Sequence, residues 1–176
     1  VRARFELPGM TADLRGPTVC EVIDKAGIQS ILSRLGPDPL RPDRNGFERE
    51  RFISKLASRK TAVGQQLMDQ SVIAGIGNVY RAELLFRSAI NPHTPGNVLP
   101  AELADRIWQD SVTLMPIGVR TGLMLTREGH LRGWPKLADR YYVYKREGQP
   151  CRECGHEVTM ELMATRKLYY CARCQK

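Results

Sequence analysis

The chain has 176 residues, of which 42% are hydrophobic and 26% are charged, proportions that are ordinary for a globular protein in water. No apolar run approaches the roughly 20 residues of a membrane helix, and no segment resembles a secretion signal, so we expect a cytoplasmic protein. Lys and Arg number 27 against 19 Asp and Glu, a formal net charge of +8. From Arg120 onward 12 residues are basic and 6 acidic, which favours a polyanionic partner, nucleic acid before an anionic membrane.

The N-terminal residues are expected to be the remnant of a β domain. Residues 1–7 alternate apolar and polar side chains, as a strand does, and Pro8 and Gly9 favour a turn. Residues 18–23 are a further candidate strand. Because two strands cannot bury a face by themselves, we assign residues 1–35 to a sheet whose other strands lie elsewhere. Cys20 is expected to be a buried apolar residue within it.

Residues 36–145 are expected to form a mostly α-helical domain that ends in an irregular connector. Two prolines and a glycine in residues 36–39 break regular structure and mark the boundary. Apolar residues at helical spacing predict helices over residues 46–59, 62–73, 79–89 and 100–115. After residue 116 the periodicity fades, and residues 141–144 are expected to lead into a strand. Trp108 is predicted to lie in the helical core and Trp134 to pack within the connector.

The last segment, residues 146–176, carries four cysteines in two close pairs: Cys151, Cys154, Cys171 and Cys174. Each pair places two sulfurs on one tight turn, and two such turns at the base of a hairpin supply the thiolates of a closed, tetrahedral zinc site. Residues 158–162 and 167–170 are the expected strands, and Gly155 suits a left-handed position. We predict one structural Zn²⁺ in a β-hairpin finger; two disulfides, a redox pair or an iron–sulfur cluster are the alternatives.

A glycine turn, Gly75-Ile76-Gly77-Asn78, separates two of the expected helices. The helix that follows begins with free amide groups and a positive dipole end, which suit a phosphate group. Asn78 could cap this helix or bond a phosphate oxygen itself. Taken alone, two glycines between helices are more typical of close packing than of binding.

Three segments in order resemble the formamidopyrimidine-DNA glycosylase and endonuclease VIII family. Its helix-two-turn-helix resembles residues 66–92, QLMDQSVIAGIGNVYRAELLFRSAINP; its zinc finger resembles residues 143–155 and 170–176; its interdomain linker resembles residues 35–40. The resemblance implies a base-excision DNA glycosylase and AP lyase that binds double-stranded DNA carrying oxidised bases or abasic sites, as a monomer in a bacterial cytoplasm. It also implies phosphate contacts from Gly75, Gly77, Asn78 and Arg166.

The start of the sequence departs from the family pattern. The family's chemistry resembles attack by an N-terminal proline amine assisted by a glutamate, whereas this sequence starts with Val1 and Arg2. We therefore expect no catalytic residue in the chain, which should bind DNA without cutting it. A non-enzymatic zinc-finger DNA-binding module and a zinc-ribbon domain without a nucleic-acid role are the alternatives. Gly64, where formamidopyrimidine-type members often carry lysine, favours the endonuclease VIII branch.

Several other residues are assigned structural roles. Glu83 and Arg87 lie four apart on one helix and are expected to pair. Asp69 and Gln70 are expected to brace the glycine turn. The remaining assignments place the histidines on the surface and the tyrosines of the finger on its inner face: His93, His130, His156, Tyr141, Tyr142, Tyr144, Tyr169 and Tyr170.

Overall fold

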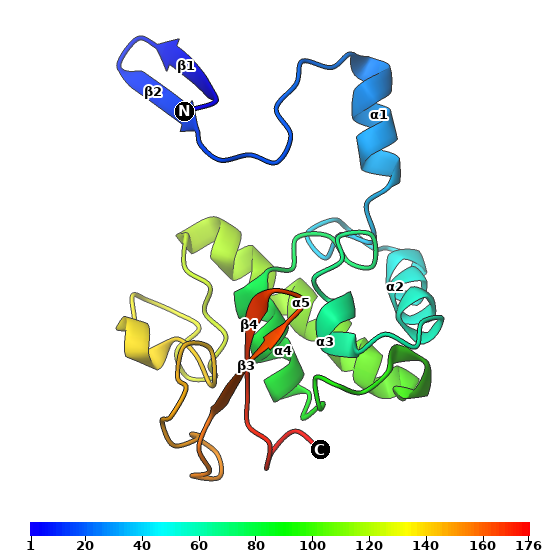
Figure 1. Ribbon diagram of the computed structural model, residues 1–176, viewed down its shortest axis with the longest axis vertical. Helices are drawn as coiled ribbons and strands as arrows, with labels where there is room; N and C mark the ends of the chain where they lie inside the picture. The colour runs from blue at the N-terminus through cyan, green and yellow to red at the C-terminus, as the bar shows by residue number, and fades with distance from the viewer. The chain divides into compact units, whose positions relative to one another are not determined.

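The structure is a computed structural model that describes residues 1–176 (Figure 1). The chain divides into two compact units, Val1–Arg34 and Leu35–Lys176. The second unit contains all the helices after residue 34 and the C-terminal hairpin. No helix in the chain combines the length and the apolar character that crossing a membrane requires.

The first unit consists of a hairpin and one helix. Strand β1 (Ala3–Leu7) pairs antiparallel with β2 (Met10–Leu14), and Gly9 takes the positive φ of 76° that the short turn needs. The strand expected at residues 18–23 is absent, because these residues instead lead into helix α1 (Lys25–Ser33). Asp24 caps α1 by accepting a hydrogen bond from the amide of Gly27 at 2.8 Å. Cys20 is exposed, so its predicted burial is wrong for this chain.

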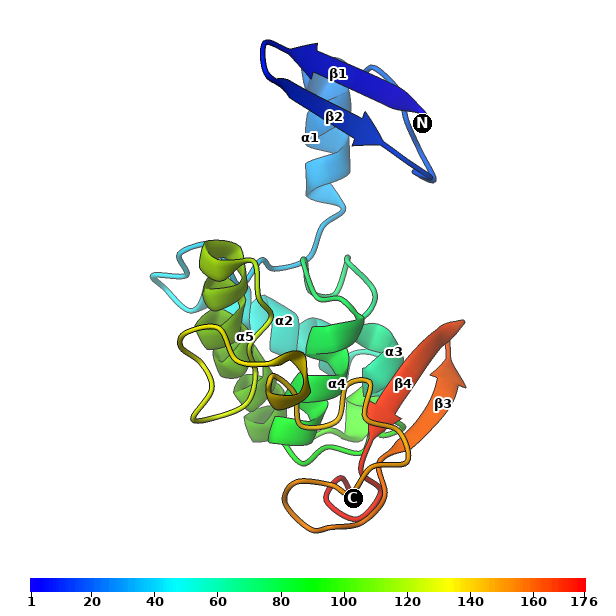
Figure 2. The same ribbon diagram turned by 90° about the vertical axis from the view of Figure 1, so that its left-hand side faces the viewer.

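The second unit is built around one central helix, α4 (Asn78–Arg87), which is buried from Val79 to Phe86 (Figures 1 and 2). Helices α2 (Phe47–Ala57) and α5 (Ala101–Thr121) contact each other beside it, and α3 (Val63–Gln66) and the short η1 (Gly96–Val98) complete the helical part. The core between them includes Phe52, Leu56, Leu67, Ile73, Leu84, Leu85, Ile107, Trp108 and Leu114. The predicted position of Trp108 is therefore confirmed.

Two helices have lengths that differ from those predicted. The helix expected over residues 62–73 is a single turn, α3, because the chain then folds into turns in which Asp69 accepts a hydrogen bond from the amide of Ser71 at 2.9 Å. Helix α5 continues through Pro116 to Thr121. Proline removes one helical hydrogen bond, but Val112, whose carbonyl loses its partner, is exposed, so water can replace that bond. Gly122, with φ of 70°, ends the helix.

The connector contains the short η2 (Leu137–Asp139) and then enters the finger. Strands β3 (Thr159–Met163) and β4 (Arg166–Tyr170) pair antiparallel around Ala164 and Thr165, which both have positive φ, as a two-residue hairpin turn requires. The strand expected after residues 141–144 is absent. Strand β4 lies beside helix α4, and the two share a second core made of Ala82, Phe86, Tyr142, Val143, Cys151, Val158, Tyr169 and Cys171 (Figure 2).

Candidate nucleic-acid interface and metal centre

The four cysteines of the finger converge on one point. Their sulfur atoms all lie within 4.8 Å of one another, with Cys151 Sγ 3.8 Å from Cys174 Sγ and Cys154 Sγ 3.5 Å from Cys171 Sγ. Thiolates about 2.3 Å from a zinc ion are about 3.8 Å apart in a tetrahedron. Separations of this size are far longer than a disulfide bond of about 2.0 Å, so the cluster fits one structural zinc ion.

Hydrogen bonds fix the backbone around each cysteine pair. Gly155 has the left-handed φ of 73° predicted for it, and its amide donates to the carbonyl of Cys151 at 2.9 Å. The backbone amide of His156 lowers the pKa of the Cys154 thiol to about 7, which favours the thiolate. In the second pair, Gln175 accepts from the amide of Cys171 at 2.9 Å and donates to the carbonyl of Ile90 at 2.9 Å. Gln175 therefore fastens this end of the finger to the residues that follow α4.

The glycine turn before α4 is held by one side chain. Gln70 accepts from the amide of Gly75 through Oε1 at 2.8 Å and donates through Nε2 to the carbonyl of Ile76 at 2.9 Å, which confirms its predicted bracing role. Gly75 has a φ of 82°, a conformation that favours glycine. Asp69 pairs with Arg59 at 2.7 Å and supports the preceding turn rather than the glycines. The turn is consequently fixed in shape before any ligand arrives.

The first turn of α4 presents backbone amides without a side-chain cap. Gly77 is the N-cap residue and has no side chain, so the amides of the first helical turn have no partner within the helix. A Cβ atom added to Gly77 would meet nothing within 4 Å, so the space beside the Cα of Gly77 is open. Asn78 does not cap the helix: its Nδ2 donates to the carbonyl of Lys167 at 2.8 Å.

The tip of the hairpin meets the start of α4 at the carbonyl of Lys167. This oxygen accepts from Asn78 Nδ2 at 2.8 Å and from Arg81 Nη2 at 2.9 Å, and Arg81 Nη2 also donates to Asn78 Oδ1 at 2.5 Å. Arg166, the neighbour of Lys167 at the start of β4, is exposed. The structure thus brings the glycine turn, Asn78 and the hairpin tip together, although they are almost ninety residues apart in the sequence.

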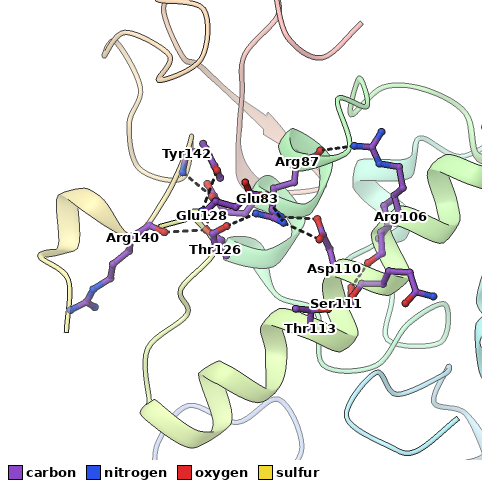
Figure 3. A network of polar contacts seen from close by, with 12 residues as sticks. Glu83, Arg87, Arg106, Asp110, Ser111, Thr113, Thr126, Glu128, Arg140 and Tyr142 are labelled. Atoms are coloured by element: carbon purple, nitrogen blue, oxygen red, sulfur yellow. Dashed lines mark hydrogen bonds and ion pairs between the residues drawn. The ribbon is translucent and has the colours of Figure 1, made fainter. Parts of the chain in front are cut away.

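The middle of the same helix holds the connector through Glu83 (Figure 3). The predicted ion pair between Glu83 and Arg87 is wrong, because Glu83 is fully buried and faces the connector. Its carboxylate accepts from Thr126 Oγ1 at 2.6 Å and from three successive amides, those of Tyr142, Val143 and Tyr144, at 2.8, 2.9 and 2.9 Å. Sequence reasoning missed this role; the one available signal was an acid directly beside the buried Leu84 and Leu85.

Arg87 instead pairs with α5. Its Nε and Nη2 donate to the two carboxylate oxygens of Asp110 at 2.7 and 3.0 Å, and its Nη1 donates to the carbonyl of Thr126 at 2.9 Å (Figure 3). Glu128 lies 3.4 Å from the same guanidinium but is mostly exposed. These contacts join the last residue of α4 to α5 and to the connector.

The remaining predicted side chains fall into two groups. Tyr141, Tyr142 and Tyr169 are buried as expected, and His156 is exposed. Trp134 is 77% exposed, so its predicted packing is wrong: the connector around it buries no apolar surface against that ring. His93 is exposed, as predicted for a surface residue, and its Nε2 lies 2.7 Å from Glu161 Oε1 on β3.

The comparisons with known proteins identify two domains. Residues 35–128 match the formamidopyrimidine-DNA glycosylase H2TH domain. Residues 148–176 match a zinc finger found in formamidopyrimidine-DNA glycosylase and isoleucyl-tRNA synthetase. The second match covers all four cysteines, which supports zinc over the alternative metal and disulfide assignments.

Whole-chain relatives agree with these matches. Endonuclease 8 1 of Mycobacterium tuberculosis is 44% identical over 179 residues, which cover 99% of this chain and 66% of the relative. The formamidopyrimidine-DNA glycosylase of Salmonella paratyphi B is 34% identical over 150 residues, 84% of this chain and 54% of that protein. The chain therefore spans two thirds or less of these relatives. The identity is higher to endonuclease 8, which is the branch of the family that Gly64 favoured.

Solved structures show the same fold. MutM (Fpg) of Thermus thermophilus superposes with a TM-score of 0.69 at 31% identity, over 86% of this chain and 57% of that one. Lactococcus lactis Fpg, solved with DNA that contains an abasic site, gives 0.70 at 24% identity over 86% of this chain and 55% of that one. On the combined evidence of its H2TH domain, its four-cysteine finger and these relatives, the chain belongs to the formamidopyrimidine-DNA glycosylase and endonuclease VIII family.

Proposed function

We propose that these 176 residues form the DNA-gripping part of a bifunctional base-excision DNA glycosylase and AP lyase that acts on oxidised bases. The observation that carries the proposal is the junction at the Lys167 carbonyl, which joins the uncapped start of α4 to the hairpin tip. A DNA phosphate bound by the backbone amides at the start of α4 would lie on the same surface of the protein as Arg166. The names of the similar proteins support this proposal: one is an endonuclease 8, another a formamidopyrimidine-DNA glycosylase, and Lactococcus lactis Fpg was solved with DNA that contains an abasic site.

Each part of the proposed interface has its own physical role. The amides near Gly75 and Gly77 supply the positive end of a helix dipole, to which a phosphate binds without needing a side chain. Asn78 supplies a side-chain amide, and Arg166 a planar guanidinium that matches two phosphate oxygens. Cys151, Cys154, Cys171 and Cys174 hold the zinc that fixes the finger, and because all four positions are thiolates, the metal stabilises rather than catalyses.

The proposed organisation keeps three segments. Residues 1–35 belong to a β domain whose further strands would cover the exposed apolar side chains of β1 and β2, such as Phe5 and Leu7. Residues 36–145 are the H2TH domain with its connector, and residues 146–176 are the finger. The base-removing chemistry belongs to the whole protein, and double-stranded DNA with an oxidised base or an abasic site is its proposed partner, bound by a monomer.

Replacing Arg166 with alanine should weaken binding to a short duplex with a tetrahydrofuran abasic site by about 1–3 kcal/mol, because a guanidinium–phosphate contact is lost. Fluorescence anisotropy at several salt concentrations measures the change. Arg173→Ala is the matched control, since Arg173 is an exposed cation of the same finger that lies at the second cysteine pair and not at the tip. If both variants bind as the unchanged chain does, the hairpin tip does not hold DNA.

Replacing Gly77 with alanine should reduce DNA binding without reducing stability. Gly77 has an extended backbone, with φ of −118°, and an added methyl group would contact no protein atom, so the fold should tolerate it. The methyl group would project into the space that a phosphate must enter, so affinity should fall roughly tenfold. Thermal unfolding and anisotropy test the two halves separately; an unchanged affinity would remove the α4 amides from the interface.

A further inference from the structure

One arginine in the helical unit is buried without a counter-charge. Arg81 has no exposed surface, and no carboxylate forms an ion pair with it. Its Nη2 bonds Asn78 Oδ1 and the Lys167 carbonyl, whereas Nε and Nη1 have no hydrogen-bond partner at all. A buried cation with unsatisfied donors is costly, so its place beside the proposed phosphate site requires an explanation.

Two other arginines, the partly buried Arg87 and the buried Arg146, show how the fold normally treats such a group. Arg87 forms a two-point ion pair with Asp110. Arg146 has no carboxylate partner, but its Nε, Nη1 and Nη2 all donate, to Gln149 Oε1 and to the carbonyls of Tyr142 and Pro150. Arg81 alone of the three has neither a counter-ion nor a full set of acceptors. Burial lowers the pKa of its guanidinium, and the nearby charge of Arg166 lowers it further.

We propose that Arg81 is the positioning residue of the DNA interface: it clamps Asn78 to the hairpin tip, and its uncompensated charge is balanced only when a DNA phosphate binds over the start of α4. The inference rests on the proposed function and deepens it. In this arrangement the phosphate supplies the negative charge that the protein omits. The free protein carries the cost of an unpaired cation, and DNA binding removes that cost.

The clamp also explains the orientation of Asn78. An amide side chain can point either its oxygen or its nitrogen toward a neighbour, and the guanidinium of Arg81, which only donates hydrogen bonds, can bond only the oxygen. With Oδ1 held by Arg81, Nδ2 must face outward toward Lys167 and the hairpin tip. One hydrogen of Asn78 Nδ2 is thereby bonded to the Lys167 carbonyl, and the second is left for an anion.

The test compares Arg81→Met with Arg87→Met, a matched change to a partly buried arginine of the same helix. Each protein is measured for thermal unfolding and for its affinity for the abasic-site duplex. Arg81→Met should lose affinity roughly tenfold or more while its unfolding midpoint stays the same or rises, since a buried unpaired charge is replaced by an apolar side chain. Arg87→Met should show the reverse: a lower midpoint, because Asp110 loses its partner, and an affinity within about twofold.

A conservative variant keeps the test decisive. Arg81→Lys retains the charge but cannot bond Asn78 and Lys167 in the same geometry, so its affinity should lie between those of the unchanged chain and Arg81→Met. If Arg81→Met fails to fold, or loses midpoint and affinity together, Arg81 is structural and the inference is wrong. It is also wrong if the unchanged chain and Arg81→Met bind equally. If the unchanged chain itself does not bind the duplex, the proposed function fails.

Discussion

Removing the zinc ion should unfold the finger and abolish DNA binding while the helical part stays folded. The finger has few apolar residues of its own, and two of the metal-binding cysteines, Cys151 and Cys171, are part of its core. Structural zinc sites contribute about 10–16 kcal/mol of binding energy to small fingers of this kind, which such a core cannot replace. Helices α2, α4 and α5 have a separate core, built around Phe52, Leu84 and Ile107, and should retain their circular dichroism.

A strong chelator or the substitution Cys171→Ser provides the change, and zinc content, circular dichroism and anisotropy with abasic DNA provide the measurements. Cys20→Ser is the control within the same chain, because Cys20 is exposed and lies outside the cluster. It should keep one zinc ion per chain and full affinity. A Cys171→Ser protein with unchanged zinc content and DNA affinity would contradict a structural metal at this position.

The parts of the fold that follow from local sequence rules were predicted with their correct type and place. The cysteine spacing indicated the finger, and the alternating strands around Ala164 and Thr165 form as expected. The apolar residues at helical spacing after Val79 indicated α4, and its side chains from Val79 to Phe86 are buried. These features depend on residues close together in the chain, where spacing and turn preference decide the structure.

The errors occurred where distant contacts decide the structure. Residues 62–73 have helical spacing, yet the chain leaves the helix after Gln66, whose side chain is buried and donates to the carbonyls of Leu56 and Thr61. Residues 141–144 have strand-like composition, but Glu83 takes the amides that a neighbouring strand would need. The Gln66 contacts reach back only 5 and 10 residues, whereas the Glu83 contacts join segments 59–61 residues apart, which only the tertiary fold brings together.

The same distinction holds for the proposed interface. The glycine turn and the finger were each visible in the sequence, and the resemblance to the family suggested which of their residues contact phosphate. Their meeting point was not visible, because it is a backbone oxygen, the carbonyl of Lys167, bonded by Asn78 and Arg81. Every residue has a backbone carbonyl, so the identity of Lys167 does not indicate this junction. It could be found only in three dimensions.

Replacing Glu83 with glutamine should destabilise the folded chain by about 3–5 kcal/mol. The buried carboxylate accepts four hydrogen bonds, from Thr126 and from the amides of Tyr142, Val143 and Tyr144. In glutamine an NH₂ group replaces one carboxylate oxygen. This group cannot accept a hydrogen bond, so the buried donors that bond that oxygen lose their partner. Urea unfolding measures the free energy, and hydrogen exchange at the three amides should accelerate if the connector is released.

Glu128→Gln is the matched control. Glu128 belongs to the same network, but its side chain is 74% exposed and its one contact with Arg87 is a long one, at 3.4 Å. Its effect should stay within about 0.5 kcal/mol. Glu83 and Asn78 lie on one helix, so α4 holds the finger at two points: the hairpin tip through Asn78 and the entering connector through Glu83. Release of the second point should therefore lower DNA affinity even where the finger keeps its zinc. Equal stability of the Glu83→Gln and Glu128→Gln proteins would show that the hydrogen bonds of Glu83 do not hold the connector.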